Sequence, residues 1–174
     1  MGNEKKLLGI LIVFLLSVLT GCATKKPADD SEKMSRIETG FISGISGNQI
    51  LVNDIFFDIS EAEVVTDQGE PYQKDRLEIG SYVETRAVGP ILESYPAQAK
   101  SEKLLVFIDE DSLLLKEGVA AVVRFSESEG GKPVVLHNVE FVEDKARLRI
   151  NLTAGLESGS ADFVYDYETK SVLN

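Results

Sequence analysis

Closely spaced turn-forming clusters between residues 36 and 108 constrain the fold more than any other feature of this 174-residue sequence. Ser46-Gly47-Asn48, Asn53-Asp54 and Asp67 to Pro71 are rich in the Gly, Pro, Asn, Asp and Ser residues that favour turns. From Ile55 to Ser60, isoleucine or phenylalanine occupies every second position. A period of two is typical of a strand with one buried face, so this region is predicted to consist of short strands.

The remaining segments of this region complete the predicted set of strands. Further strands are expected at residues 36–45, 49–53, 62–66, 81–88 and 102–109, with a short helical or extended connection before a turn at Gly80. Many short strands separated by turns, with one such connection, predict a mainly β fold. The predicted domain spans residues 35–108 and is a small β-barrel of the oligonucleotide/oligosaccharide-binding (OB) type. A plain β-sandwich is the alternative, because the turn spacing fits it too.

Residues 109–174 have a different pattern and are predicted to form a small α+β unit. A helix over residues 111–127 would begin at the acidic run Asp109 to Asp111, which suits a helix start, and end at Gly130-Gly131. Its predicted apolar face consists of Leu114, Gly118, Ala121, Val122 and Phe125. Gly118 and the nearby valines also suit a strand, so the strand alternative stays open.

After this helix, alternating apolar and polar residues predict a three-stranded antiparallel meander. Its strands would cover residues 133–143, 146–154 and 161–174, with a turn at Asp144-Lys145 and a loop at residues 155–160. Alternation of Arg147, Arg149 and Asn151 with apolar neighbours indicates one buried face.

The N-terminus has the pattern of an export signal. Lys5 and Lys6 precede an apolar run from Leu7 to Leu19, and the small residues Thr20 and Gly21 follow it. The apolar run is shorter than the roughly 20 residues that a membrane-spanning helix needs. Residues 1–21 are therefore predicted to be a signal peptide.

The four residues from Leu19 to Cys22 resemble the lipobox of bacterial lipoproteins. The resemblance implies cleavage between Gly21 and Cys22 and lipidation of Cys22, with acyl chains such as palmitate. Two acyl chains on one residue give a stable anchor, and lipidation also accounts for the only cysteine of the chain. Residues 22–34 would be the lipidated cysteine and a polar, flexible tether with an rms reach of about 20 Å. The expected location is the extracytoplasmic face of the cell membrane.

Charge and residue content disfavour several functions. The first 21 residues hold two lysines and one glutamate, so the net charge of −11 becomes −12 for a chain that begins at Cys22. Such an acidic protein repels phosphate backbones, so we expect no nucleic-acid partner and a soluble, monomeric folded part. His137 is the only histidine, and we expect a structural or solvated role for it. No metal site, cofactor or catalytic residue is predicted, and the chain is not expected to be an enzyme.

The segment from Gly80 to Phe107 carries a more specific similarity. A strand that begins after Gly80, a turn near Gly89-Pro90 and the run Glu93-Ser94-Tyr95-Pro96-Ala97-Gln98-Ala99 lead into the last strand. Residues 37–108 with this run resemble the YobA-like domain family of small lipoproteins from Gram-positive bacteria. The resemblance implies an OB-like barrel on a lipid anchor and implies no particular reaction.

The run at residues 93–99 has two interpretations. Pro96 lacks an amide hydrogen, which excludes a central strand at that position, and Tyr95 before it is pushed towards extended geometry. Glu93, Ser94, Tyr95 and Gln98 are thus candidates for the lip of a ligand groove. Alternatively, the Tyr95 ring plugs the open end of the barrel and Gln98 bonds loop carbonyls.

The sequence therefore predicts a non-catalytic lipoprotein of the cell envelope that binds a protein, a peptide or an envelope glycan. A second hypothesis is an inhibitor or sensor accessory of a membrane peptidase or signalling protein, with the C-terminal unit making the contact. An envelope hydrolase is the third, because so many acids permit a catalytic carboxylate pair although nothing selects one.

Overall fold

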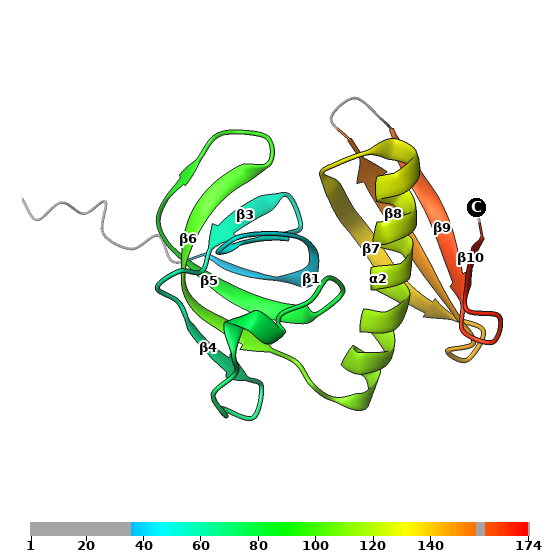
Figure 1. Ribbon diagram of the computed structural model, residues 1–174, viewed down its shortest axis with the longest axis horizontal. Coiled ribbons are helices and arrows are strands. Elements are labelled where there is room, and N and C mark those ends of the chain that lie inside the picture. The colour runs from blue at the N-terminus through cyan, green and yellow to red at the C-terminus, as the bar shows by residue number, and fades with distance from the viewer. Residues whose placement is uncertain (1–35, 156–158, 174) are drawn as a thin grey trace, which may run out of the picture. The chain divides into compact units, whose positions relative to one another are not determined.

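The computed structural model describes residues 36–155 and 159–173 (Figure 1). The predicted signal peptide, the predicted cleavage site at Gly21 and Cys22, and the predicted tether at residues 22–34 therefore lie outside the described residues. Within the described residues, no helix combines the length and the apolar character needed to cross a membrane.

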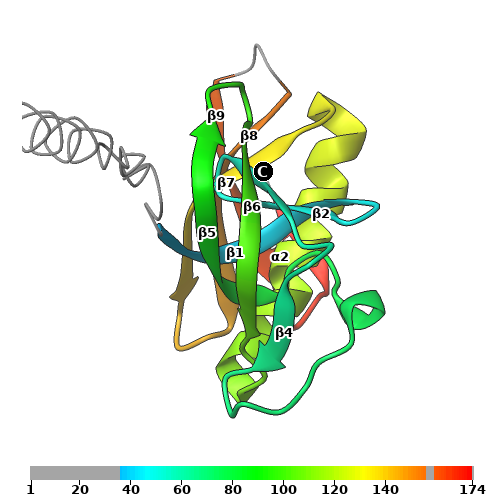
Figure 2. The same ribbon diagram turned by 90° about the vertical axis from the view of Figure 1, so that its left-hand side faces the viewer.

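The first part of the chain is a β-barrel. Its strands are β1 (Ile37–Ser46), β2 (Gln49–Val52), β3 (Ile55–Asp58), β4 (Glu63–Thr66), β5 (Tyr82–Leu92) and β6 (Ala97–Val106), with a short 3-10 turn at Lys74–Arg76 before β5. Five of them form a ring in the order β3-β2-β1-β5-β6, which closes because β3 pairs in parallel with the first part of β6. β4 pairs with the second part of β6 and lies outside the ring (Figure 2).

The barrel confirms the predicted OB-like fold, and the β-sandwich alternative is wrong because one sheet closes on itself. The expected alternation is also present in β3, where Ile55 and Phe57 are buried and Phe56 and Asp58 are only half-buried. The interior is filled by buried apolar side chains from every strand of the ring, among them Ile42, Ile50, Val52, Val83, Ala87 and Leu104.

The prediction of a turn at Gly89-Pro90 is wrong, because β5 continues through these residues to Leu92. Gly89 has a φ of 71°, and the pairing of β5 with β6 shifts register between Val88 and Leu92. A left-handed glycine therefore bends the strand without ending it. Since β6 begins at Ala97, the β5–β6 hairpin is longer than predicted.

The second part consists of helix α2 (Glu110–Gly130) and the strands β7 (Val134–Val142), β8 (Arg147–Ala154), β9 (Ser160–Asp166) and β10 (Ser171–Leu173). The helix prediction is confirmed, and the Asp109 side chain caps it by accepting a 3.0 Å hydrogen bond from the Ser112 amide. The antiparallel sheet has the order β10-β9-β8-β7, and α2 covers one face of it (Figure 1).

The prediction of three strands in this sheet is wrong, because the last predicted strand contains a turn. Asp166 accepts hydrogen bonds from the amides of Glu168 and Thr169, and this local bonding reverses the chain between β9 and β10. The Arg147 guanidinium also donates to Asp166, at 2.9 Å. The backbone amide of Thr169 and this guanidinium lower the pKa of the Asp166 carboxyl to about 2.

The two parts meet through side chains of β1 and β5. Phe41 of β1 belongs to the core between α2 and its sheet, and Tyr82 of β5 packs against that core with the two ring centroids 4.7 Å apart. Gly80, just before β5, lies so close to α2 that a Cβ atom there would be 2.3 Å from the carbonyl oxygen of Lys116. The start of β5 is therefore fitted against the helix backbone.

Replacing Gly80 with alanine is expected to destabilise the fold by about 2–4 kcal/mol, because the substitution adds a backbone clash to a left-handed φ of 90°. Gly69→Ala is the matched control, since its φ is 84° but nothing lies within 4 Å of the added Cβ. Urea denaturation should show a loss of about 1 kcal/mol for this control. Equal losses for the two variants would contradict the close packing of Gly80 on α2.

We expect the fold to lose stability in acid because the Asp166 carboxyl becomes protonated there. Its pKa is about 2 in the folded chain against an ordinary value of 3.8, so its contribution is complete above about pH 4 and is lost as the pH falls towards 2. In Asp166→Asn, the free energy of unfolding should depend less on pH over this range, whereas Asp67→Asn in an exposed loop should keep the wild-type dependence. Identical pH profiles for wild type and Asp166→Asn, measured by urea denaturation, would contradict this assignment.

Candidate functional site

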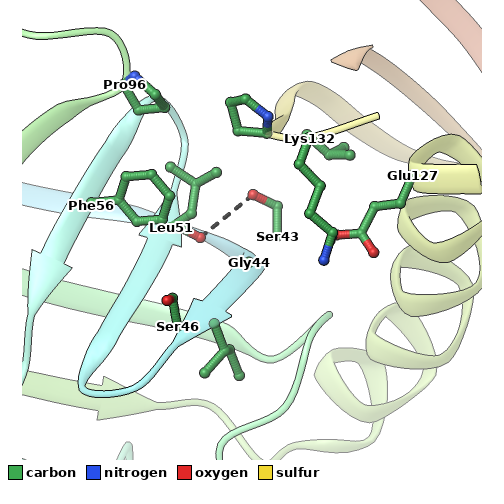
Figure 3. Close-up of a pocket in the computed structure, with 11 residues that line it drawn as sticks. Ser43, Gly44, Ser46, Leu51, Phe56, Pro96, Glu127 and Lys132 are labelled. Carbon is green, nitrogen blue, oxygen red and sulfur yellow. Dashed lines mark hydrogen bonds and ion pairs between the residues drawn. The ribbon is translucent and has the colours of Figure 1, made fainter. Parts of the chain in front are cut away.

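A cleft of about 370 Å³ lies between the outer surface of the barrel and the connection from α2 to β7 (Figure 3). Its lining residues come from three separate parts of the chain: Ser43, Gly44, Ile45, Ser46, Leu51 and Phe56 from β1 to β3, Pro96 from the β5–β6 hairpin, and Glu127, Lys132, Pro133 and Val134 from the C-terminal part. The volume is within the range of small-molecule pockets, about 300–1,000 Å³.

The barrel supplies the apolar part of the cleft. Leu51 and Phe56 are paired across β2 and β3, which places them side by side on the barrel surface. Gly44 pairs with Leu51 on the other side, and a Cβ atom at Gly44 would lie 3.4 Å from the Leu51 Cβ. The glycine thus leaves the cleft open beside Leu51. The buried hydroxyl of Ser43 donates a long, 3.5 Å hydrogen bond to the Leu51 carbonyl (Figure 3).

The β5–β6 hairpin supplies Pro96 at a second side of the cleft. The tip of the hairpin is closed by the Ser94 hydroxyl, which donates to the Pro96 carbonyl at 2.6 Å. Leu92 and Tyr95, on either side of Ser94, are 58% and 56% exposed. Two large apolar side chains therefore stand in solvent on the same hairpin that supplies Pro96, and exposed apolar groups are common where a surface contacts a partner.

The C-terminal part supplies the charged side of the cleft. Glu127 comes from the last turns of α2, and Lys132 follows the helix (Figure 3). The Lys132 ammonium and the Glu127 carboxylate form an ion pair of 3.0 Å, in which the Glu127 side chain is 19% exposed and the Lys132 side chain 72%. Pro133 and Val134 extend this side with apolar surface.

The cleft combines an apolar surface with two serine hydroxyls and one ion pair. Hydroxyl groups can both donate and accept hydrogen bonds, and the exposed ammonium of Lys132 can turn towards a ligand acceptor. An apolar lining with a few polar groups is the usual composition of a recognition site. The arrangement suits a ligand that presents an apolar group together with hydrogen-bonding groups.

The structure places the four predicted ligand residues around the hairpin. Glu93, Ser94 and Tyr95 are exposed at its tip, and Gln98 is exposed on β6. None of the four lines the cleft, whereas Pro96 from the same run does. Their role in ligand binding stays a prediction. The alternative that Tyr95 plugs the barrel is wrong, because its side chain is exposed.

Gln98 and Leu92 line a different hollow of about 560 Å³, formed by residues of β2, β3, β5 and β6. Asp58 lies at its edge, and hydrogen bonding to Ser60, led by a 2.9 Å bond from the Ser60 amide, lowers the pKa of this carboxyl. Within the described residues the Gln98 side chain has no hydrogen-bond partner, so it does not satisfy the loop carbonyls as the plug alternative required.

Sequence reasoning missed the main cleft residues. Phe56 had a detectable signal, because it is a large apolar residue on the otherwise polar face of its strand. Ile45, which is 43% exposed near the end of β1, is a second such residue. Glu127 and Lys132 gave no signal, since only the fold brings the end of α2 to the barrel.

A comparison of the chain with protein-family models, curated proteins and solved structures finds no match. The resemblance to the YobA-like family therefore stays a prediction from the residues that carry it.

Proposed function

We propose that the chain is a lipid-anchored, non-catalytic binding module on the extracytoplasmic face of the cell membrane, and that the cleft holds a segment of a polypeptide partner. The observation that carries this proposal is the cleft itself, which places apolar residues of the barrel and Pro96 of the hairpin beside serine hydroxyls and an ion pair. The sequence predicted a protein, a peptide or an envelope glycan as the ligand, and the first two are retained here.

The anchor is supported by the sequence from Lys5 to Cys22. The basic residues, the apolar run and the lipobox-like Leu19 to Cys22 occur in the order and spacing that export and lipidation need. A doubly acylated Cys22 is a stable anchor. The acidic folded part, at a net charge of −12 from Cys22 onward, would be repelled by anionic headgroups, so lipid rather than charge provides the attachment.

The chemistry of the cleft favours a polypeptide. Phe56 and Pro96 are half-buried and offer an apolar surface for a side chain, as peptide-binding grooves do. The hydroxyl of Ser46 and the ammonium of Lys132 can pair with backbone groups of an extended segment. A carbohydrate would leave most of this apolar surface without a matching group.

An inhibitor or sensor accessory of a membrane peptidase or signalling protein is the second candidate. It is favoured by the fact that the C-terminal part contributes Glu127, Lys132 and Pro133 to the same cleft. In that case the bound segment belongs to one membrane protein whose activity changes on binding. Identification of the partner separates the two functions.

The anchor is tested by metabolic labelling with a fatty acid. The wild-type chain should incorporate label and should accumulate as an uncleaved precursor when globomycin blocks the lipoprotein signal peptidase. Cys22→Ser should incorporate no label. Adding Ser46→Cys to this variant, which places a new thiol within the folded part, should not restore labelling. An unlabelled wild-type chain would contradict the anchor and would leave the cleft proposal standing.

The cleft is tested by photo-crosslinking in living cells. A photoreactive residue placed at Ile45 or at Lys132, which line the cleft from the barrel and from the C-terminal part, should trap the same polypeptide because one segment contacts both sides. The same residue at Glu168, in the exposed β9–β10 turn, should not trap it.

A second substitution distinguishes the cleft from a general surface contact. Ser46→Trp fills the cleft from an exposed position and should reduce the crosslinked product at least about tenfold, the equivalent of about 1.4 kcal/mol. Gln68→Trp, at an exposed position outside the cleft, is the matched control and should leave crosslinking unchanged. Persistence of the product in Ser46→Trp, or no product from either side, would contradict the proposal.

A further inference from the structure

The charges at the end of α2 that borders the cleft depart from the usual pattern of a helix terminus. The last turn of α2, residues 127–130, holds Glu127 and Glu129 and no basic residue. The carboxyl end of a helix carries the negative end of the helix dipole, where basic side chains are stabilising and acidic ones are not. This end of the helix therefore presents an excess of negative charge, and Glu127 brings part of it to the cleft.

The two members of the ion pair in the cleft differ in their exposure to solvent. The Glu127 side chain is 19% exposed, whereas the Lys132 side chain that pairs with it at 3.0 Å is 72% exposed (Figure 3). Within the part of the chain that the structure describes, Lys132 is the only cation paired with Glu127. A carboxylate that is largely withdrawn from water therefore depends on a single, solvent-exposed ammonium.

Packing of the helix end holds the backbone on both sides of Glu127. Ser126 is 1% exposed, and its hydroxyl donates a 2.8 Å hydrogen bond to the Val122 carbonyl. Gly130 lies against β8, where a Cβ atom would be 2.9 Å from the Cβ of Ala154. Lys132, in contrast, has a long side chain with a flexible four-carbon stem. Of the two charged groups, the ammonium is thus the one that can move.

This difference determines which charge a ligand of the cleft can carry. An ion pair with a solvent-exposed member contributes little to stability, so the Lys132 ammonium can leave Glu127 at small cost. The Glu127 carboxylate would then be left largely buried and without a partner, which is unfavourable. A ligand that brings its own cation replaces Lys132 and avoids this cost. An anionic ligand would instead meet the acidic end of α2.

The apolar lining of the cleft suits the remainder of a basic side chain. Phe56 and Pro96 line the cleft from the barrel, and Pro133 lines it next to Lys132. Arginine and lysine have long apolar stems that lie on such surfaces while the charged group reaches a polar partner. The net charge of −12 from Cys22 onward also attracts a basic segment at longer range.

We propose that the polypeptide segment held in the cleft carries an arginine or lysine whose charged group binds the Glu127 carboxylate in place of Lys132. The inference rests on the proposed polypeptide cleft and adds the chemistry of the partner segment. Lys132 acts as an internal competitor, because it occupies Glu127 in the free protein and turns away when the segment binds.

The test compares two short peptide probes that differ only in charge. One has an arginine between two leucines, and the other has the neutral and nearly isosteric citrulline in place of the arginine. Both carry the same dye, and their binding to the full chain in micelles of a nonionic detergent is followed by fluorescence anisotropy. The arginine peptide should bind at least about tenfold more tightly, because only it forms a charge-assisted pair with Glu127.

Substitutions of the two paired residues should act in opposite directions. Glu127→Gln should abolish the preference for the arginine peptide, whereas Lys132→Gln should strengthen its binding about threefold because the internal competitor is removed. Both variants break the ion pair, so tighter binding by Lys132→Gln also shows that the cleft is folded without it. Glu110→Gln, at the exposed first turn of α2, is the matched control and should leave both affinities unchanged.

Three results would each overturn the proposal. They are an absence of saturable binding or of a preference for the arginine peptide in the wild type, a retained preference in Glu127→Gln, and weaker binding of the arginine peptide in Lys132→Gln.

Crosslinking in cells separates this inference from the proposed function. With the photoreactive residue at Ile45, Glu127→Gln should reduce the crosslinked product and Lys132→Gln should increase it. A product that is unchanged in Glu127→Gln would overturn the basic segment and leave the polypeptide cleft standing. Failure of the otherwise wild-type chain to give any product would contradict the cleft proposal itself, and the basic segment with it.

Discussion

The parallel pairing of β3 with β6 is the contact on which the rest of the structure depends. It closes the ring of five strands, and it places Phe57, which is fully buried, next to the small residue Ala99. The residues that meet here are far apart in the chain, so the pairing has an entropic cost that local turns do not have. The barrel interior repays this cost by burying side chains from every strand of the ring.

Closure also determines where the surface features lie. Because β6 is held by β3 at residues 97–100, Pro96 immediately before it lines the same cleft as Phe56. The bulge around Gly89 curves the same hairpin. Two exposed apolar residues, Leu92 and Tyr95, are therefore presented by a short loop on a rigid support, which is the usual arrangement for binding residues.

Turn chemistry and periodicity predicted the short strands, helix α2 and the C-terminal sheet, because each depends on neighbours in the sequence. They left a β-sandwich open as the alternative to the barrel, because closure depends on the long-range pairing of β3 with β6. The strand count of the sheet was wrong because the turn after Asp166 is formed by side-chain bonding that periodicity does not register. The cleft was not predictable, since Glu127 and Lys132 reach the barrel only through tertiary packing.

The packing of Gly80 against α2 has a consequence for how the protein can be divided. The cleft takes one side from the barrel and the other from the C-terminal part, and the core around Phe41 is common to both parts. A fragment that ends before α2 would keep every strand of the barrel but only one side of the cleft. The cleft is in this sense a property of the joint between the two parts and not of either part by itself.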